Sequence, residues 1–187
     1  MRTSIIVAGI LAVTFLAAGA VRAAEQPLEV NDANATESLA HWNNHYVPSL
    51  ALSDDAKVGK HSIVGDFEFT QSALFCADMA GKTSFDLTGY SKLRFWAKAS
   101  KKTDNLLVML MTNGFEVRRD AVVELNTEWT QYELAFDEAT FNKNAAPNAD
   151  FGHVSTIAFY YNDAGMDRIW IDGLEFVKAE KAPAAKP

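Results

Sequence analysis

Two short stretches of the sequence pair an aromatic ring with a planar polar side chain. Arg94 lies two residues before Trp96, and Tyr160 lies two residues before Asn162. Residues two apart in a β-strand face the same side, so each pair would share one surface. An aromatic ring can lie on the apolar C–H face of a sugar while a polar neighbour meets its hydroxyl groups. We therefore predict that these four residues bind a ligand of this kind.

The segment His41-Trp42-Asn43-Asn44-His45-Tyr46 is the densest polar and aromatic cluster of the chain. On a helix, His41 and His45 would lie on one side and could bind Zn²⁺. The zinc-hydrolase motif requires Glu directly after the first His, and Trp42 occupies that position. The cluster is better interpreted as a loop in which Trp42 or Tyr46 contributes to a ligand cleft. The sequence favours still more the alternative that Trp42 closes one end of the folded domain.

The pair Arg118-Arg119 is a small basic spot in an acidic chain. A guanidinium can clamp the carboxylate of an acidic sugar, which makes Arg118 a further candidate for ligand binding. The alternative is that the two arginines lie on an edge strand, where charge deters aggregation.

Catalytic motifs are missing from the sequence. It contains no Gly-x-Ser-x-Gly, no phosphate-binding Gly loop and no Tyr-x-Lys-x-Gly-x-Tyr strand of the jelly-roll polysaccharide lyases. Cys76 is the only cysteine, and its apolar neighbours favour a buried thiol over a reactive one. We therefore expect that the protein is not an enzyme.

These candidate residues must be positioned by β-strands. Turn residues separate a series of β-type segments, and no long amphipathic helix lies between them. The Asn113-Gly114 pair is a typical hairpin turn. The pattern predicts an all-β fold, an antiparallel β-sandwich, with strands over 28–30, 63–70, 72–77, 92–98, 106–112, 115–118, 122–125, 129–136, 156–161 and 169–176.

Alternation within the strands predicts which side chains face the core. Leu93 and Phe95 would be buried, with Arg94 and Trp96 on the opposite side. The residues predicted to face the core in two further strands are Tyr132, Leu134, Phe136, Ile157, Phe159 and Tyr161. The run from Leu106 to Met111 is apolar on both faces, so its outer face should be partly covered or line a groove.

The first 23 residues have the features of a signal peptide. Arg2 gives a positive charge, residues 5–18 are apolar, and small residues precede a cleavage site after Ala23, with a second possible site after Ala20. We expect an exported protein, periplasmic or extracellular, with one domain over 24–178 and a disordered tail over 179–187.

The mature chain is strongly acidic. Cleavage removes two of the 17 basic residues and none of the 24 acidic ones, which leaves a net charge of −9. An acidic surface repels phosphate groups, so nucleic acid and anionic membranes are not expected as partners. No second apolar run is long enough to span a membrane.

Four motifs in order resemble those of carbohydrate-binding-module-like jelly rolls. They are the turn Val58-Gly59-Lys60-His61-Ser62, the turn from Asp86 to Tyr90 followed by Leu93-Arg94-Phe95-Trp96, the strand that begins Trp129-Thr130-Gln131-Tyr132, and the ending Ile171-Asp172-Gly173-Leu174. This galactose-binding-like sandwich is similar to family 11 carbohydrate-binding modules and the CIA30-like domain. The resemblance covers about residues 28–177.

The same resemblance implies a structural Ca²⁺ site. By position it would use Glu29, backbone carbonyls near 57–60 and Asp172, a set of oxygen donors that suits this ion. The sequence departs from the family pattern, because Gly173 replaces the second of two adjacent acids. The alternative is that Asp172 caps a backbone turn and Glu29 is solvated.

The sequence therefore favours an exported, non-catalytic carbohydrate-binding module. It would recognise an oligo- or polysaccharide through outward aromatic and polar residues on one sheet. The alternative is a CIA30-like structural or protein-interaction domain of an envelope complex, which would bind a protein partner and no sugar.

Overall fold

The computed structural model describes residues 28–31, 36–45, 47–67, 72–77, 84–112, 117–147, 149–161 and 167–179. In these segments the chain forms eleven β-strands and one short 3-10 helix, η1 (Thr36–His41). None of the helical structure in this part of the chain is long and apolar enough to cross a membrane. The prediction of an all-β fold is confirmed.

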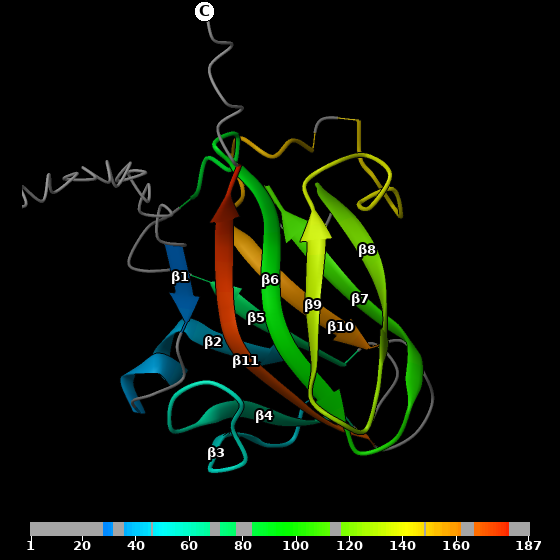
Figure 1. Cartoon of the computed structure of the whole chain (residues 1–187). Helices are drawn as coiled ribbons and strands as arrows, with labels where there is room; N and C mark the ends of the chain where they lie inside the picture. The colour runs from blue at the N-terminus through cyan, green and yellow to red at the C-terminus, as the bar shows by residue number, and fades with distance from the viewer. Residues whose placement is uncertain are drawn as a thin grey trace, which may run out of the picture.

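The strands form two antiparallel sheets that face each other (Figure 1). The six-stranded sheet has the order β3-β4-β11-β6-β9, and β1 pairs with β11 at the side of this path. Its strands are β1 (Leu28–Asn31), β3 (Leu50–Ser53), β4 (Ser62–Phe67), β6 (Tyr90–Ala99), β9 (Thr130–Ala135) and β11 (Asp167–Lys178).

The five-stranded sheet has the order β2-β5-β10-β7-β8. Its strands are β2 (Trp42–His45), β5 (Ser72–Ala77), β7 (Thr103–Met111), β8 (Arg118–Leu125) and β10 (Thr156–Tyr161). Successive strands along the chain alternate between the two sheets at several points, which is the arrangement of a sandwich.

The core lies between the inner faces of the two sheets, where apolar residues alternate with outward-facing ones as predicted. Phe95 of the six-stranded sheet and Phe159 of the five-stranded sheet are fully buried, and their rings meet edge-to-face at 5.3 Å. Trp42 is also buried and stacks on Phe159 at 6.1 Å. Because Trp42 is part of this core, it closes the sandwich and is not available to a ligand.

Several strand predictions match the structure, and others differ. The predicted 72–77 and 156–161 strands have the observed bounds. The predicted strand over 122–125 is the second half of β8, which begins at Arg118. Of the predicted strand over 115–118, only Arg118 lies in β8, and residues 113–116 lie outside the described residues. Strands β2 and β3 were not predicted, because polar residues and short length hide their alternation.

A bulge interrupts β11 between Asp172 and Glu175. Gly173 lies in it with a positive φ of 56°. This conformation is costly for residues with a side chain, and a Cβ there would come within 3.1 Å of Val58. The positive φ explains why position 173 is glycine and not the second of the two adjacent acids in the family pattern.

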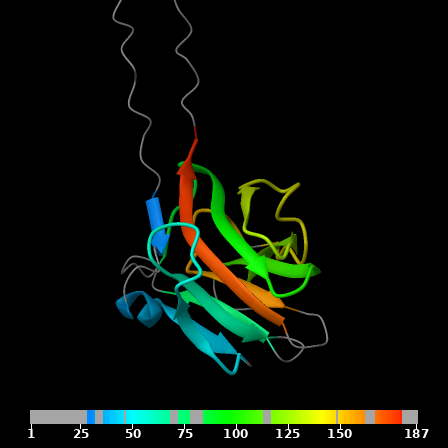
Figure 2. The same cartoon turned by 60° about the horizontal axis from the view of Figure 1, so that its bottom comes forward.

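Strands β1 and β11 are antiparallel neighbours, with Leu28 opposite Phe176. The beginning of β1 and the end of β11 therefore lie side by side (Figure 2). The expected signal peptide and most of the expected tail fall outside the described residues.

Candidate functional site

The outer face of the five-stranded sheet carries a second apolar cluster, separate from the core. Met109, Met111 and Ala158 are buried there, with Leu107 and Tyr160 packed against them. In register, Tyr160 lies opposite Leu107 on β7, and Ala158 lies opposite Met109. This confirms the prediction that the outer face of the β7 strand is partly covered.

Polar residues of β8 border this cluster. Arg118 lies opposite Met111 and Asp120 lies opposite Met109, so both share the outer face. The Arg118 Nε lies 3.2 Å from the Asp120 carboxylate, and the Asn144 amide donates to Asp120 at 2.9 Å. We call Leu107, Met109, Met111, Ala158, Tyr160, Arg118 and Asp120 the tyrosine face.

Burial changes the acidity of two groups on the tyrosine face. Asp120 is fully buried, and this burial raises the pKa of its carboxyl group although Asn144 and Arg118 act against the rise. Burial likewise raises the pKa of the Tyr160 phenol, while the charge of Arg118 lowers it. The phenol is therefore uncharged near neutral pH and can donate a hydrogen bond.

Arg119 points away from the tyrosine face. Its Nε donates to the carbonyl of Ala149 at 2.8 Å, and its guanidinium lies over the ring of Phe151 at 5.4 Å. The long loop between β9 and β10 runs beside β8 over residues 143–146, where Asp120 and Lys143 form an isolated bridge. Arg118 and Arg119 thus lie on the last strand of the sheet order, as the edge-strand alternative predicts.

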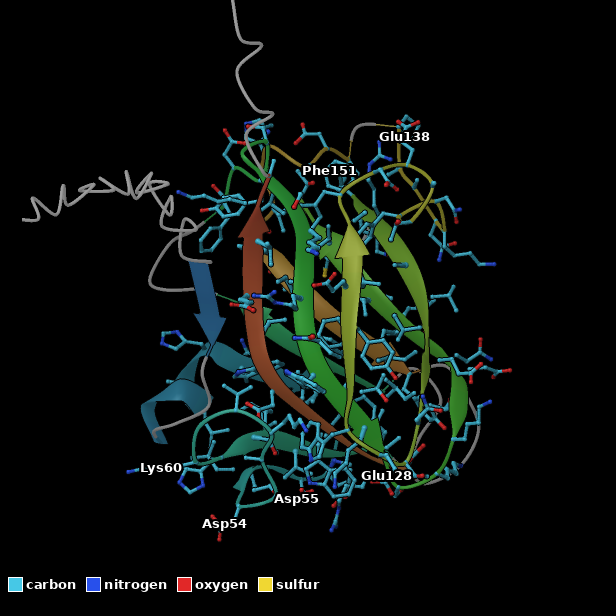
Figure 3. All side chains as sticks on the ribbon, in the orientation of Figure 1. Asp54, Asp55, Lys60, Glu128, Glu138 and Phe151 are labelled. Atoms are coloured by element: carbon cyan, nitrogen blue, oxygen red, sulfur yellow. The ribbon has the colours of Figure 1, made fainter. Side chains whose placement is uncertain are left out.

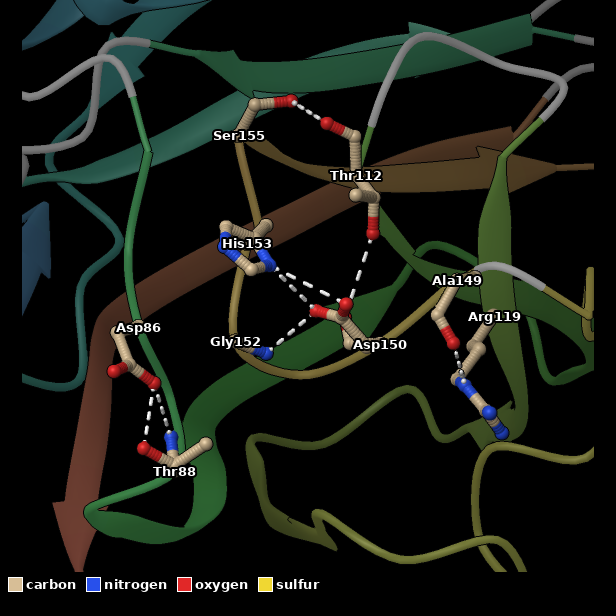
Figure 4. A network of polar contacts seen from close by, with 9 residues as sticks. All are labelled: Asp86, Thr88, Thr112, Arg119, Ala149, Asp150, Gly152, His153 and Ser155. Atoms are coloured by element: carbon tan, nitrogen blue, oxygen red, sulfur yellow. Dashed lines mark hydrogen bonds and ion pairs between the residues drawn. The ribbon is translucent and has the colours of Figure 1, made fainter.

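The end of the long loop is held by local polar contacts (Figure 4). Asp150 accepts a hydrogen bond from the Gly152 amide at 2.8 Å and contacts His153 at 3.1 Å. Nearby, Asp86 accepts hydrogen bonds from the amide and the hydroxyl of Thr88, which confirms the turn predicted there. These contacts define the loop conformation beside the sheets but bring together no catalytic set.

The outer face of the six-stranded sheet carries three of the four tryptophans. Trp96, Trp129 and Trp170 are all half-buried. The Lys57 ammonium lies over the ring of Trp96 at 4.8 Å. The Lys98 ammonium lies 4.8 Å from the Trp170 ring and 5.2 Å from the Trp129 ring. We call these three tryptophans and two lysines the tryptophan face.

The loop over residues 54–61 joins β3 to β4 and attaches to the tryptophan face. Asp55 accepts a hydrogen bond from the Trp129 indole at 3.0 Å and another from Lys98. These two bonds, the Lys98 bond foremost, hold the pKa of the Asp55 carboxyl below its usual value. Figure 3 shows Asp54, Asp55 and Lys60 of the loop at the same end of the molecule as Glu128, which precedes Trp129.

Arg94 lies on the same outer face but is held in ion pairs. It bonds Glu175 of β11 and lies 3.8 Å from Glu133 of β9. Gln131 and Glu133 face outward beside Trp96 and Arg94, as alternation predicted. The guanidinium thus crosses three strands and helps to fix them together.

The predicted ligand-binding residues do not lie on one sheet. Trp96 and Arg94 belong to β6 of the six-stranded sheet, whereas Tyr160 and Arg118 belong to the five-stranded sheet. Alternation places all four outward, and outward directions on two stacked sheets are opposite. The prediction of a single binding surface that includes both aromatic pairs is therefore wrong.

The 41–46 cluster is also divided. His41 ends η1 and His45 ends β2, so the helical alignment that zinc binding would require does not exist. Trp42 is in the core. Tyr46 and Asn162 lie outside the described residues, and their role in ligand binding stays a prediction.

Asp172 is buried and caps a backbone turn. One of its carboxylate oxygens accepts hydrogen bonds from the amides of Lys57 and Val58, both at 2.7 Å. These two hydrogen bonds are those of a carboxylate that caps a backbone turn, as the alternative to the calcium site predicts. Glu29 lies opposite Glu175 in register, and its side chain is outside the described residues.

The described residues contain no group of three or more His, Cys, Asp or Glu that could hold a metal ion. Asp172 is thus the one carboxylate of the expected calcium site whose position is defined. A single carboxylate does not make a calcium cage, so the calcium site stays a prediction.

Sequence reasoning missed part of both faces. Trp170 could not be assigned to a side because the bulge after it shifts the alternation. Trp129 lies one residue before β9, so strand alternation does not by itself place its side chain. Asp120 gave no signal, because a single acid in a strand is common and its hydrogen-bond partner Asn144 is distant in sequence.

Comparison with protein-family models gives no match, and comparison with curated proteins gives none either. Solved structures do match. A family 11 carbohydrate-binding module of a cellulosomal cellulase of Clostridium thermocellum has 11% sequence identity and a TM-score of 0.63, over 84% of this chain and 97% of that chain. A second structure of a family 11 module from this organism, in complex with a β-1,3-1,4-mixed-linked tetrasaccharide, has 13% identity and a TM-score of 0.63, over 83% and 98% of the two chains.

Two further structures extend the comparison. The family 30 carbohydrate-binding module of a Clostridium thermocellum cellulosomal cellulase has 12% identity and a TM-score of 0.53, over 84% of this chain and 96% of that chain. An agarase has 7% identity and a TM-score of 0.62, over 84% of this chain and only 25% of its own. The protein therefore has the β-sandwich fold of carbohydrate-binding modules, as the sequence motifs predicted.

Proposed function

We propose that the protein is an exported, non-catalytic carbohydrate-binding protein that binds a glycan on the tyrosine face. A two-sheet sandwich needs apolar residues only on its inner faces, so an apolar outer surface requires another explanation. The supporting observation is the position of Tyr160, which is half-buried on this outer face and packs with Leu107 on the buried cluster that contains Met109 and Ala158.

The chemistry of the tyrosine face suits a sugar. The ring of Tyr160 offers a flat apolar surface, and its phenol can donate to a hydroxyl group. Arg118 is partly exposed and can donate to a hydroxyl of the sugar. Its guanidinium is paired with the buried Asp120, which favours an uncharged sugar over an acidic one.

The similar structures support this proposal by fold. Three of them are carbohydrate-binding modules by name, and one of these three is in complex with a tetrasaccharide. Fold alone does not assign a ligand, so the surface chemistry must carry that step.

The test is affinity electrophoresis of residues 24–187 in gels that contain soluble polysaccharides. The panel includes mixed-linkage β-1,3-1,4-glucan, agarose and, as an acidic polymer, polygalacturonate. We expect retardation by an uncharged polymer. Tyr160→Ala should weaken it about tenfold, which corresponds to about 1.4 kcal/mol of lost contact, with an unchanged melting temperature.

Tyr160→Phe is the matched control, because it keeps the ring and removes only the hydroxyl. It should retain most of the retardation if stacking dominates. Absence of retardation by every polymer would contradict the proposal. Capture of one stoichiometric protein partner under the same conditions would then favour the CIA30-like interaction domain.

A further inference from the structure

We propose that the tryptophan face is a second glycan-binding surface, so that one molecule can bind two polysaccharide segments at once. The inference rests on the proposed function for the class of ligand, but it concerns a different surface. Three of the four tryptophans lie on this face, and the fourth, Trp42, is in the core.

Two of the three rings are fixed by hydrogen bonds, and all three remain partly accessible. The Trp129 indole donates to Asp55 at 3.0 Å, and the Trp170 indole donates to Ser53 at 3.3 Å. Lys98 lies between these two rings, and its side chain is only 15% exposed. Rings fixed in this way lose little conformational freedom on binding, which favours affinity.

Exposed polar groups surround Trp96. Gln131 lies opposite Trp96 on β9 and is exposed. Lys57 is exposed and covers one side of the Trp96 ring. A cation–π contact is weak at an exposed position, so a sugar can replace it on the ring while Lys57 donates to a hydroxyl.

Charge on this sheet favours an uncharged polymer. Lys98 is paired with Asp55, and Arg94 is paired with Glu175 and Glu133. An acidic polymer would therefore meet carboxylates beside most of the cations. An uncharged glycan meets hydrogen-bonding groups next to aromatic rings.

The two faces cannot belong to one binding site. They lie on the outer sides of two stacked sheets, which are separated by about 10 Å between their mean planes. The body of the sandwich lies between them, so one glycan segment cannot contact both. Two glycan segments bound at the same time must belong to two polysaccharide chains or to distant parts of one polysaccharide chain.

Tryptophan fluorescence distinguishes the two faces. Three tryptophans form one face, whereas none of the residues that define the tyrosine face is a tryptophan. The experiment titrates the Tyr160→Ala variant of residues 24–187 with mixed-linkage β-1,3-1,4-glucan and with agarose, and it records emission and gel mobility together. We expect the emission to change and part of the retardation to persist.

Two variants identify the surface. Trp96→Ala should abolish most of the emission change and weaken binding by the Tyr160→Ala protein about tenfold. Gln131→Ala removes an exposed side chain that the fold does not require, so it should weaken the same binding without changing the melting temperature. If Trp96→Ala lowers the melting temperature, Gln131→Ala carries the test.

The possible outcomes separate the two proposals. If Tyr160→Ala abolishes both retardation and emission change, the second surface is rejected and the proposed function stands. If only the tryptophan variants matter, the second surface stands and the tyrosine face is rejected. If neither polymer changes the gel mobility or the emission of the wild-type protein, both proposals are rejected. A protein that quenches the tryptophan emission at equal stoichiometry would then show that the tryptophan face binds a protein partner.

Discussion

Individual carboxylates of this protein show how surroundings decide the behaviour of one residue type. Asp55 and Asp66 are hydrogen-bonded to Lys98 and Arg168, which lowers the pKa of both. Asp120 is buried, and desolvation raises its pKa despite the nearby guanidinium of Arg118. Asp120 is thus the acid of the tyrosine face whose ionised form the fold disfavours.

The raised pKa of Asp120 predicts a specific pH dependence of stability. Between the unfolded value of 3.8 and the higher folded value, the folded protein holds a proton that the unfolded chain has lost. The contribution of Asp120 to stability therefore falls as pH rises through this range. Asp120→Asn should remove that slope, so its free energy of unfolding relative to wild type should rise with pH.

Urea unfolding at a series of pH values from 3.5 to about 6.5 measures this difference. The pKa values of Asp55 and Asp66 are lowered, so these two residues make stability rise with pH. They are present in both proteins, and their contribution cancels in the difference between the variant and wild type. A difference that is independent of pH would contradict the assignment. Direct titration of the Asp120 carboxyl by NMR should give a pKa above 3.8.

Asp172 offers a second test at the residue scale, because amides and a metal ion are alternative partners for a carboxylate. If Ca²⁺ is bound at 100 times its dissociation constant, it adds about 2.7 kcal/mol and raises the melting temperature by about 5–10 °C. Thermal melts with EDTA and with added CaCl₂ measure this effect. Since two amides already bond one Asp172 oxygen, we expect equal melting temperatures; a clear fall with EDTA would restore the calcium site.

At the scale of strands, the sequence predicts faces well and sheet membership poorly. Alternation correctly separated Leu93 and Phe95 from Arg94 and Trp96, because inward and outward positions differ in polarity. It placed Tyr160 outward by the same reasoning. Nothing in a strand's own sequence tells which of two sheets it joins, since both sheets bury the same kinds of residue. The two aromatic pairs were therefore assigned to one surface and lie on two.

The bulge in β11 gives a prediction at this scale. Gly173→Ala must adopt a positive φ and place a Cβ against Val58, so it should lower the free energy of unfolding by about 1–2 kcal/mol. Gly89→Ala is the matched control, because a Cβ there meets nothing within 4 Å. Its effect should be near zero. Equal effects of the two substitutions in urea unfolding would show that the bulge does not require glycine.

At the scale of the whole molecule, every described strand lies after the N-terminal residues that have the features of a signal peptide. The two sheets, their core and both outer faces are formed by residues from 28 onward. We therefore expect the exported protein to begin at Ala24 and to fold normally. Mass spectrometry of the protein from the periplasm or the culture medium measures its N-terminus, and intact residues 1–23 would contradict export by this route.

The pairing of β1 with β11 has a practical consequence for joining this protein to others. Leu28 and Phe176 face each other across two neighbouring strands, so the polypeptide enters and leaves the sandwich at adjacent points. A domain with adjacent entry and exit points can be inserted into a surface loop of a host protein without separating the ends of that loop. The sandwich is thus suited to being carried as an inserted module, with both broad outer surfaces still exposed.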